Sequence, residues 1–328
     1  MNKRIILTGS SGHLGSTLLN ILKNSSYEIN ALIMPGQKKP ILASNIHYFE
    51  GDIRQITSLE PLFITNSNEE LYIIHAAAII SITSKMNSNL YNVNVNGTKN
   101  IISLCLKYHV KKLIQVSSVH ALPTLPDHHL MSEINIFDAN KVHGAYAKTK
   151  AMAASLIMAA IPKGLNAILV FPSGIIGPND EGQNHLIQLF IHYLKHSLPF
   201  CINGGYDFVD VRDVAQGIII ALEKGKIGST YLLTGHYSTI KDLLLMLNPK
   251  KNIYNLPRIF AYLSLPFINF YCSLKHLRPL YTSYSLSTLK SNSNFSSQKA
   301  IIDLGYNSRP LIQSVNDTKK YLISKHLV

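Results

Sequence analysis

The feature that most limits how this chain can fold is a glycine-rich loop directly after the first apolar segment. The loop reads Thr8-Gly9-Ser10-Ser11-Gly12-His13-Leu14-Gly15, between a β-like run over Arg4–Thr8 and a helical period over Leu14–Asn24. In a strand–loop–helix unit, Gly9 allows a tight turn, Gly12 lets the backbone approach a diphosphate, and Gly15 lets helix and strand pack closely. The diphosphate would lie over N–H groups at the positive end of the helix. The sequence therefore predicts a dinucleotide-binding loop.

The rest of the first half alternates apolar β-like runs with helical periods, which is the pattern of a parallel sheet covered by helices on both faces. Candidate strands are Arg4–Thr8, Ile29–Ile33, Ile46–Phe49, Tyr72–His75, Lys112–Ser117 and Asn166–Phe171. Candidate helices are Leu14–Asn24, Thr57–Phe63, Asn87–Lys107 and Ala145–Ile161. We predict an α/β fold with a doubly wound parallel sheet of the Rossmann type.

Beyond Pro172 this rhythm weakens, and the chain is expected to form a smaller, mostly helical substrate-binding region. Residues 1–171 would form the dinucleotide-binding domain and residues 172–328 mainly the substrate region, interleaved with the first because a strand at Tyr231–Thr234 rejoins the sheet. Asp210 is placed to cap a helix that runs through Leu222.

Composition narrows the class of partner. The 328 residues have a formal net charge of +13, yet the basic residues are scattered and form no dense tract, so we expect no nucleic-acid partner. The three cysteines have no disulfide or zinc spacing, which predicts a reducing compartment and no metal site. The apolar run near the N-terminus is too short for a signal peptide, and we expect a cytoplasmic protein.

A second apolar segment, Leu256–Cys272, has two interpretations. It is interrupted by Pro257, Arg258, Pro266 and Asn269 and falls short of the about 20 apolar residues that cross a bilayer. We expect a buried or substrate-covering pair of helices and no membrane span. A peripheral membrane contact is the alternative.

The residues after the second strand bear on which dinucleotide binds. An acidic residue there would hold the adenosine ribose of NAD, but the chain reads Ile33-Met34-Pro35-Gly36-Gln37-Lys38-Lys39. Lys38 and Lys39 could meet a 2′-phosphate, so NADP(H) is favoured over NAD(H), although no arginine offers a bidentate contact. Asp52, after the third strand, is expected to accept a hydrogen bond from the adenine amino group.

Further motifs follow the loop in a fixed order. They are Asp52, His75-Ala76-Ala77-Ala78, Asn94-Val95-Asn96-Gly97-Thr98, Val116-Ser117-Ser118, Tyr146-Ala147-Lys148-Thr149-Lys150, Phe208–Ala215 and Leu304-Gly305-Tyr306. Together they resemble the extended short-chain dehydrogenase/reductase family, in its NAD-dependent epimerase/dehydratase group, and most nearly the dihydroflavonol reductase-like branch.

A hydride transfer at carbon must be matched by a proton on oxygen, and a tyrosine beside a cation can exchange that proton. Tyr146 and Lys150 are four residues apart on a predicted helix and share a face. The same spacing recurs at Tyr108/Lys112, Tyr237/Lys241, Tyr271/Lys275 and Tyr321/Lys325, so position must decide. Tyr146 alone opens the helix after the strand that ends in Ser117-Ser118. We predict Ser118, Tyr146 and Lys150 as the catalytic set.

The resemblance implies that Lys150 also holds the nicotinamide ribose and that Ser118 hydrogen-bonds the substrate oxygen. Ser173 and Phe171 would border the nicotinamide. The full set of predicted cofactor contacts is Gly9, Ser11, Gly12, His13, Leu14, Gly15, Lys38, Lys39, Asp52, Ile53, Ala76, Ala77, Ala78, Ser117, Tyr146, Lys150, Phe171 and Ser173. Asn94 is expected to shape its helix or anchor a water. Among the histidines, His120 is the candidate for a place at the site, because it lies two residues after Ser118.

Departures from the resemblance bear on the reaction. The segment after Ser118 lacks the acidic pair of the 4,6-dehydratases, and Tyr206 stands where sugar-nucleotide epimerases have an arginine. Without that arginine a nucleoside diphosphate loses charge-assisted hydrogen bonds. We expect an NAD(P)-dependent oxidoreductase that acts on a carbonyl or secondary alcohol of a fairly apolar small molecule. A sugar epimerase with the same residues and a non-catalytic cofactor sensor are the alternatives, and a homodimer through the 87–107 and 145–161 helices stays open.

Overall fold

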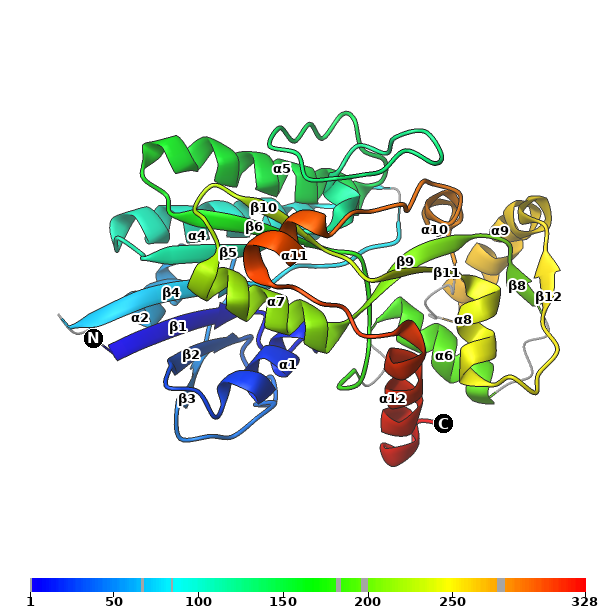
Figure 1. The fold of residues 1–328 in the computed structure, drawn as a ribbon, viewed down its shortest axis with the longest axis horizontal. Coiled ribbons are helices and arrows are strands. Elements are labelled where there is room, and N and C mark those ends of the chain that lie inside the picture. The colour runs from blue at the N-terminus through cyan, green and yellow to red at the C-terminus, as the bar shows by residue number, and fades with distance from the viewer. Residues whose placement is uncertain (1, 66–67, 84, 181–183, 196–199, 276–280) are drawn as a thin grey trace.

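The computed structural model describes residues 2–65, 68–83, 85–180, 184–195, 200–275 and 281–328. At its centre lies a parallel sheet whose strands follow one another from top to bottom in the left half of Figure 1, in the order β10-β6-β5-β4-β1-β2-β3. The strands are β1 (Asn2–Thr8), β2 (Glu28–Ile33), β3 (Ile46–Glu50), β4 (Glu69–His75), β5 (Lys112–Val116), β6 (Ala167–Pro172) and β10 (Thr230–Leu233). The strand order reverses between β1 and β4, which is where ligands of such folds bind. The predicted α/β fold class is confirmed.

Helices cover both faces of the sheet because successive strand residues point to opposite sides. Ile5 and Leu7 pack in one apolar cluster, whereas Ile6 between them packs in another. The first cluster is covered by α1 (His13–Leu22), α7 (Val211–Lys224) and α11 (Gln298–Leu304). The second is covered by α2 (Ile56–Phe63), α4 (Gly97–Lys107) and α5 (Ala145–Ala160). These near-continuous apolar strands are typical of a parallel sheet buried on both faces.

The C-terminal part of the chain forms a smaller lobe at one end of the molecule (Figure 1). Its strands are β7 (Gly174–Ile176), β9 (Gly205–Asp210) and β11 (His236–Thr239) in one sheet, and β8 (Phe200–Ile202) with β12 (Tyr254–Leu256) in another. Its helices are α6 (His185–Lys195), α8 (Ile240–Leu247), α9 (Arg258–Leu274), α10 (Ser283–Thr288) and α12 (Leu311–Ser324). Short strands such as β9 have no clear period in the sequence and escaped prediction.

Charged side chains fasten the lobe to the sheet domain. Asp210 caps α7, as predicted, by accepting a hydrogen bond from the Arg212 backbone N–H. The Arg212 guanidinium spans the carboxylates of Asp210 and Asp317, and Arg309 makes charge-assisted bonds of 2.7–2.9 Å to Asp213. Asp210 and Asp213 therefore help to hold α7 against the segment that contains α12.

The segment predicted as one helix over Asn87–Lys107 has three parts: α3 (Ser88–Tyr91), a π-helical turn (Asn92–Asn96) and α4. Asn94 explains the wider turn. Its side chain accepts a hydrogen bond from the Ile79 N–H at 2.8 Å and donates to the Ile79 carbonyl and to Thr149 at 3.0 Å. Asn94 thus clamps the chain after β4 against α5, and a π turn is where its side chain can reach both.

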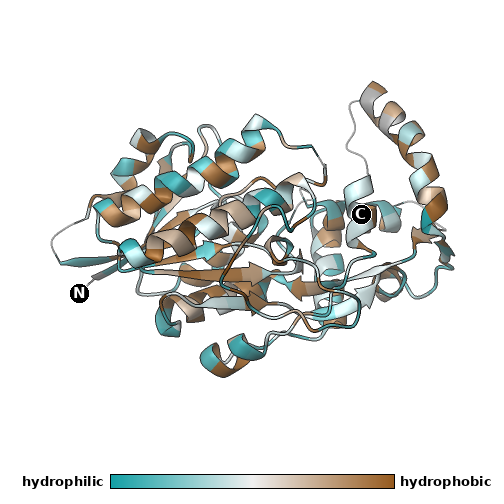
Figure 2. Cartoon of the chain, turned by 90° about the horizontal axis from the view of Figure 1, so that it is seen from above, coloured by the Kyte–Doolittle hydropathy of each residue, from teal (hydrophilic) through white to brown (hydrophobic). Residues whose placement is uncertain are grey.

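The apolar 256–272 segment was expected to form a buried or substrate-covering pair of helices, but the structure has one helix here, α9. Most of its bulky apolar side chains are exposed. Pro266 lies inside the helix without dividing it, and Figure 2 shows the helix standing out from the body of the lobe. In the described part of the chain, no helix has the length and apolarity needed to cross a membrane.

Candidate active site

The glycine-rich loop lies between β1 and α1, and two of its glycines are required by the protein itself. Gly9 has φ +73°, and a Cβ there would lie 2.7–2.8 Å from the backbone of Ala76 and Ala77. A Cβ on Gly15 would collide with the carbonyl oxygen of Gly9. The loop is therefore pressed against the end of β4 on one side and against its own helix on the other.

Gly12 is different, because the protein gives no steric reason for a glycine there. It is the N-cap of α1 with φ −78°, and the nearest atom to a Cβ at this position is the Gly9 oxygen at 3.4 Å. No side chain caps the N-terminus of α1, so its first N–H groups point outward without a side-chain acceptor. A bare helix N-terminus at a backbone that stays uncovered fits a diphosphate, and the loop therefore fits a dinucleotide.

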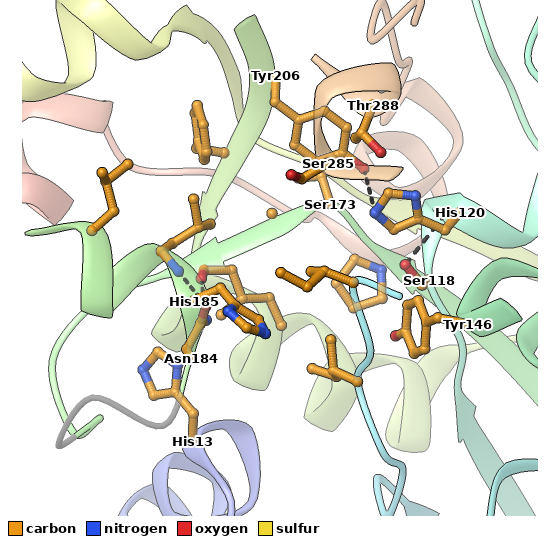
Figure 3. A pocket seen from close by; sticks show the side chains of 18 of the residues that line it. His13, Ser118, His120, Tyr146, Ser173, Asn184, His185, Tyr206, Ser285 and Thr288 are labelled. Atoms are coloured by element: carbon orange, nitrogen blue, oxygen red, sulfur yellow. Dashed lines mark hydrogen bonds between the residues drawn. The ribbon is translucent and has the colours of Figure 1, made fainter. Parts of the chain in front are cut away.

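A cavity of about 710 Å³ extends from this loop into the C-terminal lobe. Its cofactor end is lined by Gly9, Gly12, His13, Leu14, Gly15, Ala76, Ala78, Ser117, Ser118, Tyr146, Lys150 and Ser173. Figure 3 shows Ser118, His120 and Tyr146 on one side of the cavity and His13 and Asn184 on the other. The structure thus brings together a loop, two strand ends and a helix that are far apart in the sequence.

Ser118, Tyr146 and Lys150 all line this cavity and are largely buried. Ser118 follows β5, and Tyr146 and Lys150 lie in the first two turns of α5. The Lys150 ammonium donates a hydrogen bond of 2.9 Å to the Val116 carbonyl oxygen. This bond fixes the lysine at the end of the strand that leads to Ser118.

The electrostatics of this set suit proton exchange. Burial lowers the pKa of Lys150 to about 8, so the lysine is protonated in most molecules at neutral pH. Burial raises the pKa of Tyr146, and a hydrogen bond with Ser118 acts in the opposite direction. A phenol that keeps its proton beside a hydroxyl, in a cavity that a buried lysine also lines, can give a proton to an oxygen and take it back.

His120 is held by two tyrosines from the other lobe. The Tyr206 hydroxyl lies 3.1 Å from its Nε2 and the Tyr284 hydroxyl 3.1 Å from its Nδ1. The His120 ring also meets the Tyr146 ring edge-on at 6.0 Å between centroids. Desolvation lowers the pKa of His120 to about 4, so the ring is neutral at physiological pH. Tyr206 and Tyr284 thereby position the ring that borders Tyr146.

Comparison with known proteins identifies this architecture. The model of the NAD dependent epimerase/dehydratase family matches residues 5–233, which include the loop, Ser118, Tyr146 and Lys150. The chain belongs to this family. It is an NAD(P)-dependent enzyme of the extended short-chain dehydrogenase/reductase type, and the resemblance read from its motifs is confirmed.

Three similar proteins illustrate the match. A putative dihydroflavonol 4-reductase of Synechocystis sp. is 27% identical over 95% of this chain and 92% of its own. The sterol demethylase protein B of Methylococcus capsulatus is 27% identical over 73% of this chain and 72% of its own. The crystal structure of gox2253 superposes with a TM-score of 0.85 at 27% identity and full coverage of both chains.

In this epimerase/dehydratase-family chain, the predicted adenosine contacts lie outside the cavity. The Asp52 carboxylate is held by a hydrogen-bonded fork from Arg54, at 2.9–3.0 Å to Nε, which lowers the pKa of Asp52. Lys38 and Lys39 are exposed, and the Lys39 ammonium lies over the Tyr48 ring. Contacts of Asp52, Lys38 and Lys39 with the adenosine half of the dinucleotide remain predictions.

Four other predicted contacts also do not line the cavity. Phe171 is fully buried and stacks on Phe137 with 5.3 Å between ring centroids, so its side chain belongs to the core and only its neighbours Pro172 and Ser173 reach the cavity. Ser11 donates a hydrogen bond to Gln37, which ties the glycine loop to the segment after β2. Ile53 is buried beside Gly97, and the Ala77 N–H donates to the Thr8 hydroxyl.

The wall of the cavity away from the glycine loop is built from residues that were not predicted from the sequence. It is lined by Ile80, Ile82, Leu186, Leu189, Phe200, Ile202, Phe208, Ile240, Leu244, Leu256 and Leu289. Among the described lining residues, histidines aside, Lys150 and Asp180 alone are charged, and both line the cofactor end with Gly12 and His13. The substrate end of this family member is therefore apolar, and tyrosine and serine hydroxyls supply most of its polarity.

Proposed function

We propose that this family member is a reductase or dehydrogenase that interconverts a carbonyl and a secondary alcohol on a largely apolar small molecule. One observation carries the proposal: the cavity joins the Ser118, Tyr146 and Lys150 set to a wall of aliphatic and aromatic side chains. No arginine occurs among the described residues that line it. A nucleoside diphosphate sugar would leave its phosphates without charge-assisted partners there.

The residues of the chain would divide the work as follows. The glycine loop and Lys150 would hold the dinucleotide, which supplies or accepts the hydride when bound. Ser118 would donate a hydrogen bond to the carbonyl oxygen, and Tyr146 would give that oxygen a proton as the alcohol forms. In the reverse direction Tyr146 would take the proton back, and the positive charge of Lys150 would stabilise the phenolate.

We further propose a preference for NADP(H), since Lys38, Lys39 and Gln37 follow β2 where an acidic residue would favour NAD. The three cysteines are free thiols, which agrees with work in a reducing compartment such as the cytoplasm. A homodimer through α4 and α5 is also proposed, and light scattering in solution measures it.

The decisive experiment follows absorbance at 340 nm with NADPH and, separately, NADH. Apolar ketones of increasing size should consume the reduced cofactor stoichiometrically, whereas UDP-glucose should neither consume it nor be epimerised. Tyr146→Phe should abolish turnover, by about a thousandfold or more, while cofactor affinity changes little. Tyr237→Phe is the matched control, since Tyr237 and Lys241 have the same spacing away from the cavity. Substantial turnover by Tyr146→Phe would refute the mechanism.

A further inference from the structure

Helix α9 presents an unusual surface. Seven bulky apolar side chains along and around it are 41–77% exposed: Ile259, Phe260, Tyr262, Leu263, Phe267, Phe270 and Leu274. Five of them recur at spacings of three or four residues and so form one stripe along the helix. Isolated exposed apolar residues are ordinary, but a continuous stripe of this size on one element marks an interaction surface.

The opposite face of α9 packs on the protein, and on this side Leu265 and Ile268 are half-buried. Ala261 is fully buried, and the Ser264 hydroxyl lies 2.7 Å from the Tyr281 hydroxyl. Most of the bulky apolar side chains of the helix therefore face away from the protein, whereas a helix that only covered a core would turn them inward. Figure 2 shows the helix standing away from the body at the end far from the N-terminus.

The exposed apolar surface continues to the cavity. Phe200 in β8 and Tyr254 in β12 are 52% and 60% exposed, with their ring centroids 6.2 Å apart. Phe200 and Leu256, the residue that ends β12 just before α9, line the cavity wall. Tyr281, which contacts α9 through Ser264, lines it as well. The stripe and the substrate end of the cavity therefore share residues.

The sequence on both sides of α9 carries charge of one sign. Residues 243–302 contain no aspartate or glutamate, whereas they contain Lys250, Lys251, Arg258, Lys275, Arg278, Lys290 and Lys299. Sixty consecutive residues without an acid concentrate positive charge at this end of the chain. Arg258 and Lys275 bracket the helix, and no charged residue lies between them.

We propose that α9, with Phe200 and Tyr254, docks on the surface of an anionic lipid bilayer. The apolar stripe would enter the boundary between headgroups and acyl chains, and Arg258 and Lys275 at the two ends of the helix would face the anionic headgroups. A helix of 17 residues, about 25 Å long, lies in the plane of the interface with its inner face still on the protein. The cavity then opens beside the lipid, which suits an apolar substrate.

Charge also argues against a second copy of the chain as the occupant of this surface. Two copies joined face to face through α9 would bring two acid-free basic segments together, and like charges at an interface disfavour association. An anionic bilayer offers the opposite charge and an apolar layer at the same time.

The test is vesicle flotation of the full-length chain without cofactor or substrate, so that its outcome is independent of the reaction. We expect the protein to float with vesicles of phosphatidylcholine containing about 30% phosphatidylserine, far less with phosphatidylcholine alone, and less as salt rises. The variant Leu263→Gln/Phe267→Gln/Phe270→Gln should bind anionic vesicles about tenfold more weakly or worse.

The control variant Leu42→Gln/Ile136→Gln/Ile302→Gln alters side chains that are 81%, 85% and 71% exposed elsewhere, and it should float like the parent. Equal melting temperatures would show that both variants fold. Failure of the parent chain to float with anionic vesicles would overturn the proposal. Equal loss in both triple variants would overturn it too, as would light scattering in which the α9 variant alone splits a dimer.

Discussion

The Tyr206 hydroxyl lies 3.1 Å from Nε2 of His120, and the Tyr284 hydroxyl lies the same distance from Nδ1 (Figure 3). A neutral imidazole has one N–H and one lone pair. One tyrosine must therefore donate its proton to the ring, while the other accepts the ring proton and keeps its own. The three side chains together have one hydroxyl proton left for a further acceptor, beside the cavity that Tyr206 and Tyr284 both line.

Replacing Tyr206 with phenylalanine should show how much the hydrogen bond to His120 contributes to the free energy of unfolding. The substitution keeps the ring and leaves Nε2 of His120 without its partner, so the free energy of unfolding should fall by about 1–2 kcal/mol. Urea denaturation without ligand measures it. Tyr237→Phe, which removes a hydroxyl from an exposed tyrosine on the neighbouring strand, should change stability by less than about 0.5 kcal/mol. Equal stability of the two variants would contradict the assignment.

The pKa of Lys150 predicts how the reaction depends on pH. Burial lowers this pKa to about 8, so the cation that would support Tyr146 in the proposed mechanism predominates below pH 8 and is lost above it. We expect kcat/KM for carbonyl reduction to be flat near neutral pH and to fall about tenfold per pH unit above about pH 8.

Lys150→Arg is the control for that profile. Arginine keeps its charge throughout the range, so the variant should be slower because its geometry differs, yet its rate should not fall above pH 8. An unchanged alkaline limb in the arginine variant would assign the titration to another group. His120, with a pKa of about 4, should contribute no step between pH 5 and 7.

Elements with a strong local signal were predictable. The strands of the central sheet are apolar and regularly spaced, so β1, β2 and β3 lie within two residues of their predicted bounds. The order of Ser118, Tyr146 and Lys150 along the chain also sufficed to bring them to one cavity, since parallel strands end at one edge. The four competing tyrosine–lysine pairs were set aside because none of them opens the helix that follows Ser117-Ser118.

Features that depend on contacts between distant segments were not predictable. Tyr284 reaches His120 across 164 residues, and nothing beside it in the sequence marks it apart from a threonine–serine capping box at Thr282. The π turn at Asn94 arises from a clamp on Ile79. The apolarity of residues 256–272 predicted burial, whereas most of the bulky side chains of α9 are exposed. Hydrophobic composition alone does not indicate which face of a helix packs on the protein.

Asp207 should make stability depend on acid. Burial raises the pKa of this β9 carboxyl to about 6, although the Ser173 hydroxyl and the Gly235 N–H oppose the rise. A raised pKa means that the folded state holds the proton more tightly, so the contribution of this carboxyl to stability is complete below about pH 4 and is lost as pH rises through about 6. The contribution lost is of order 3 kcal/mol.

Asp207→Asn should remove that dependence, since an amide oxygen can still accept from Gly235 at 2.8 Å and does not ionise. The difference in unfolding free energy between the variant and the parent should widen in favour of the variant from about pH 4 to about pH 7. A constant difference across this range would mean that Asp207 is already ionised at the acid end.

The glycine loop offers a pair of substitutions that separates folding from cofactor binding. A Cβ at Gly15 collides with the Gly9 carbonyl oxygen, so Gly15→Ala should lose about 2 kcal/mol or more of stability despite the better helix propensity of alanine. A Cβ at Gly12 has its nearest neighbour at 3.4 Å, and the stability cost of Gly12→Ala should stay within about 1 kcal/mol, mostly from the weaker N-cap.

If a diphosphate approaches the backbone at residue 12, the methyl group of Gly12→Ala fills the space that the diphosphate needs. Calorimetry with NADPH should then show that Gly12→Ala raises Kd by about tenfold or more. Unchanged affinity in a folded Gly12→Ala protein would place the diphosphate elsewhere.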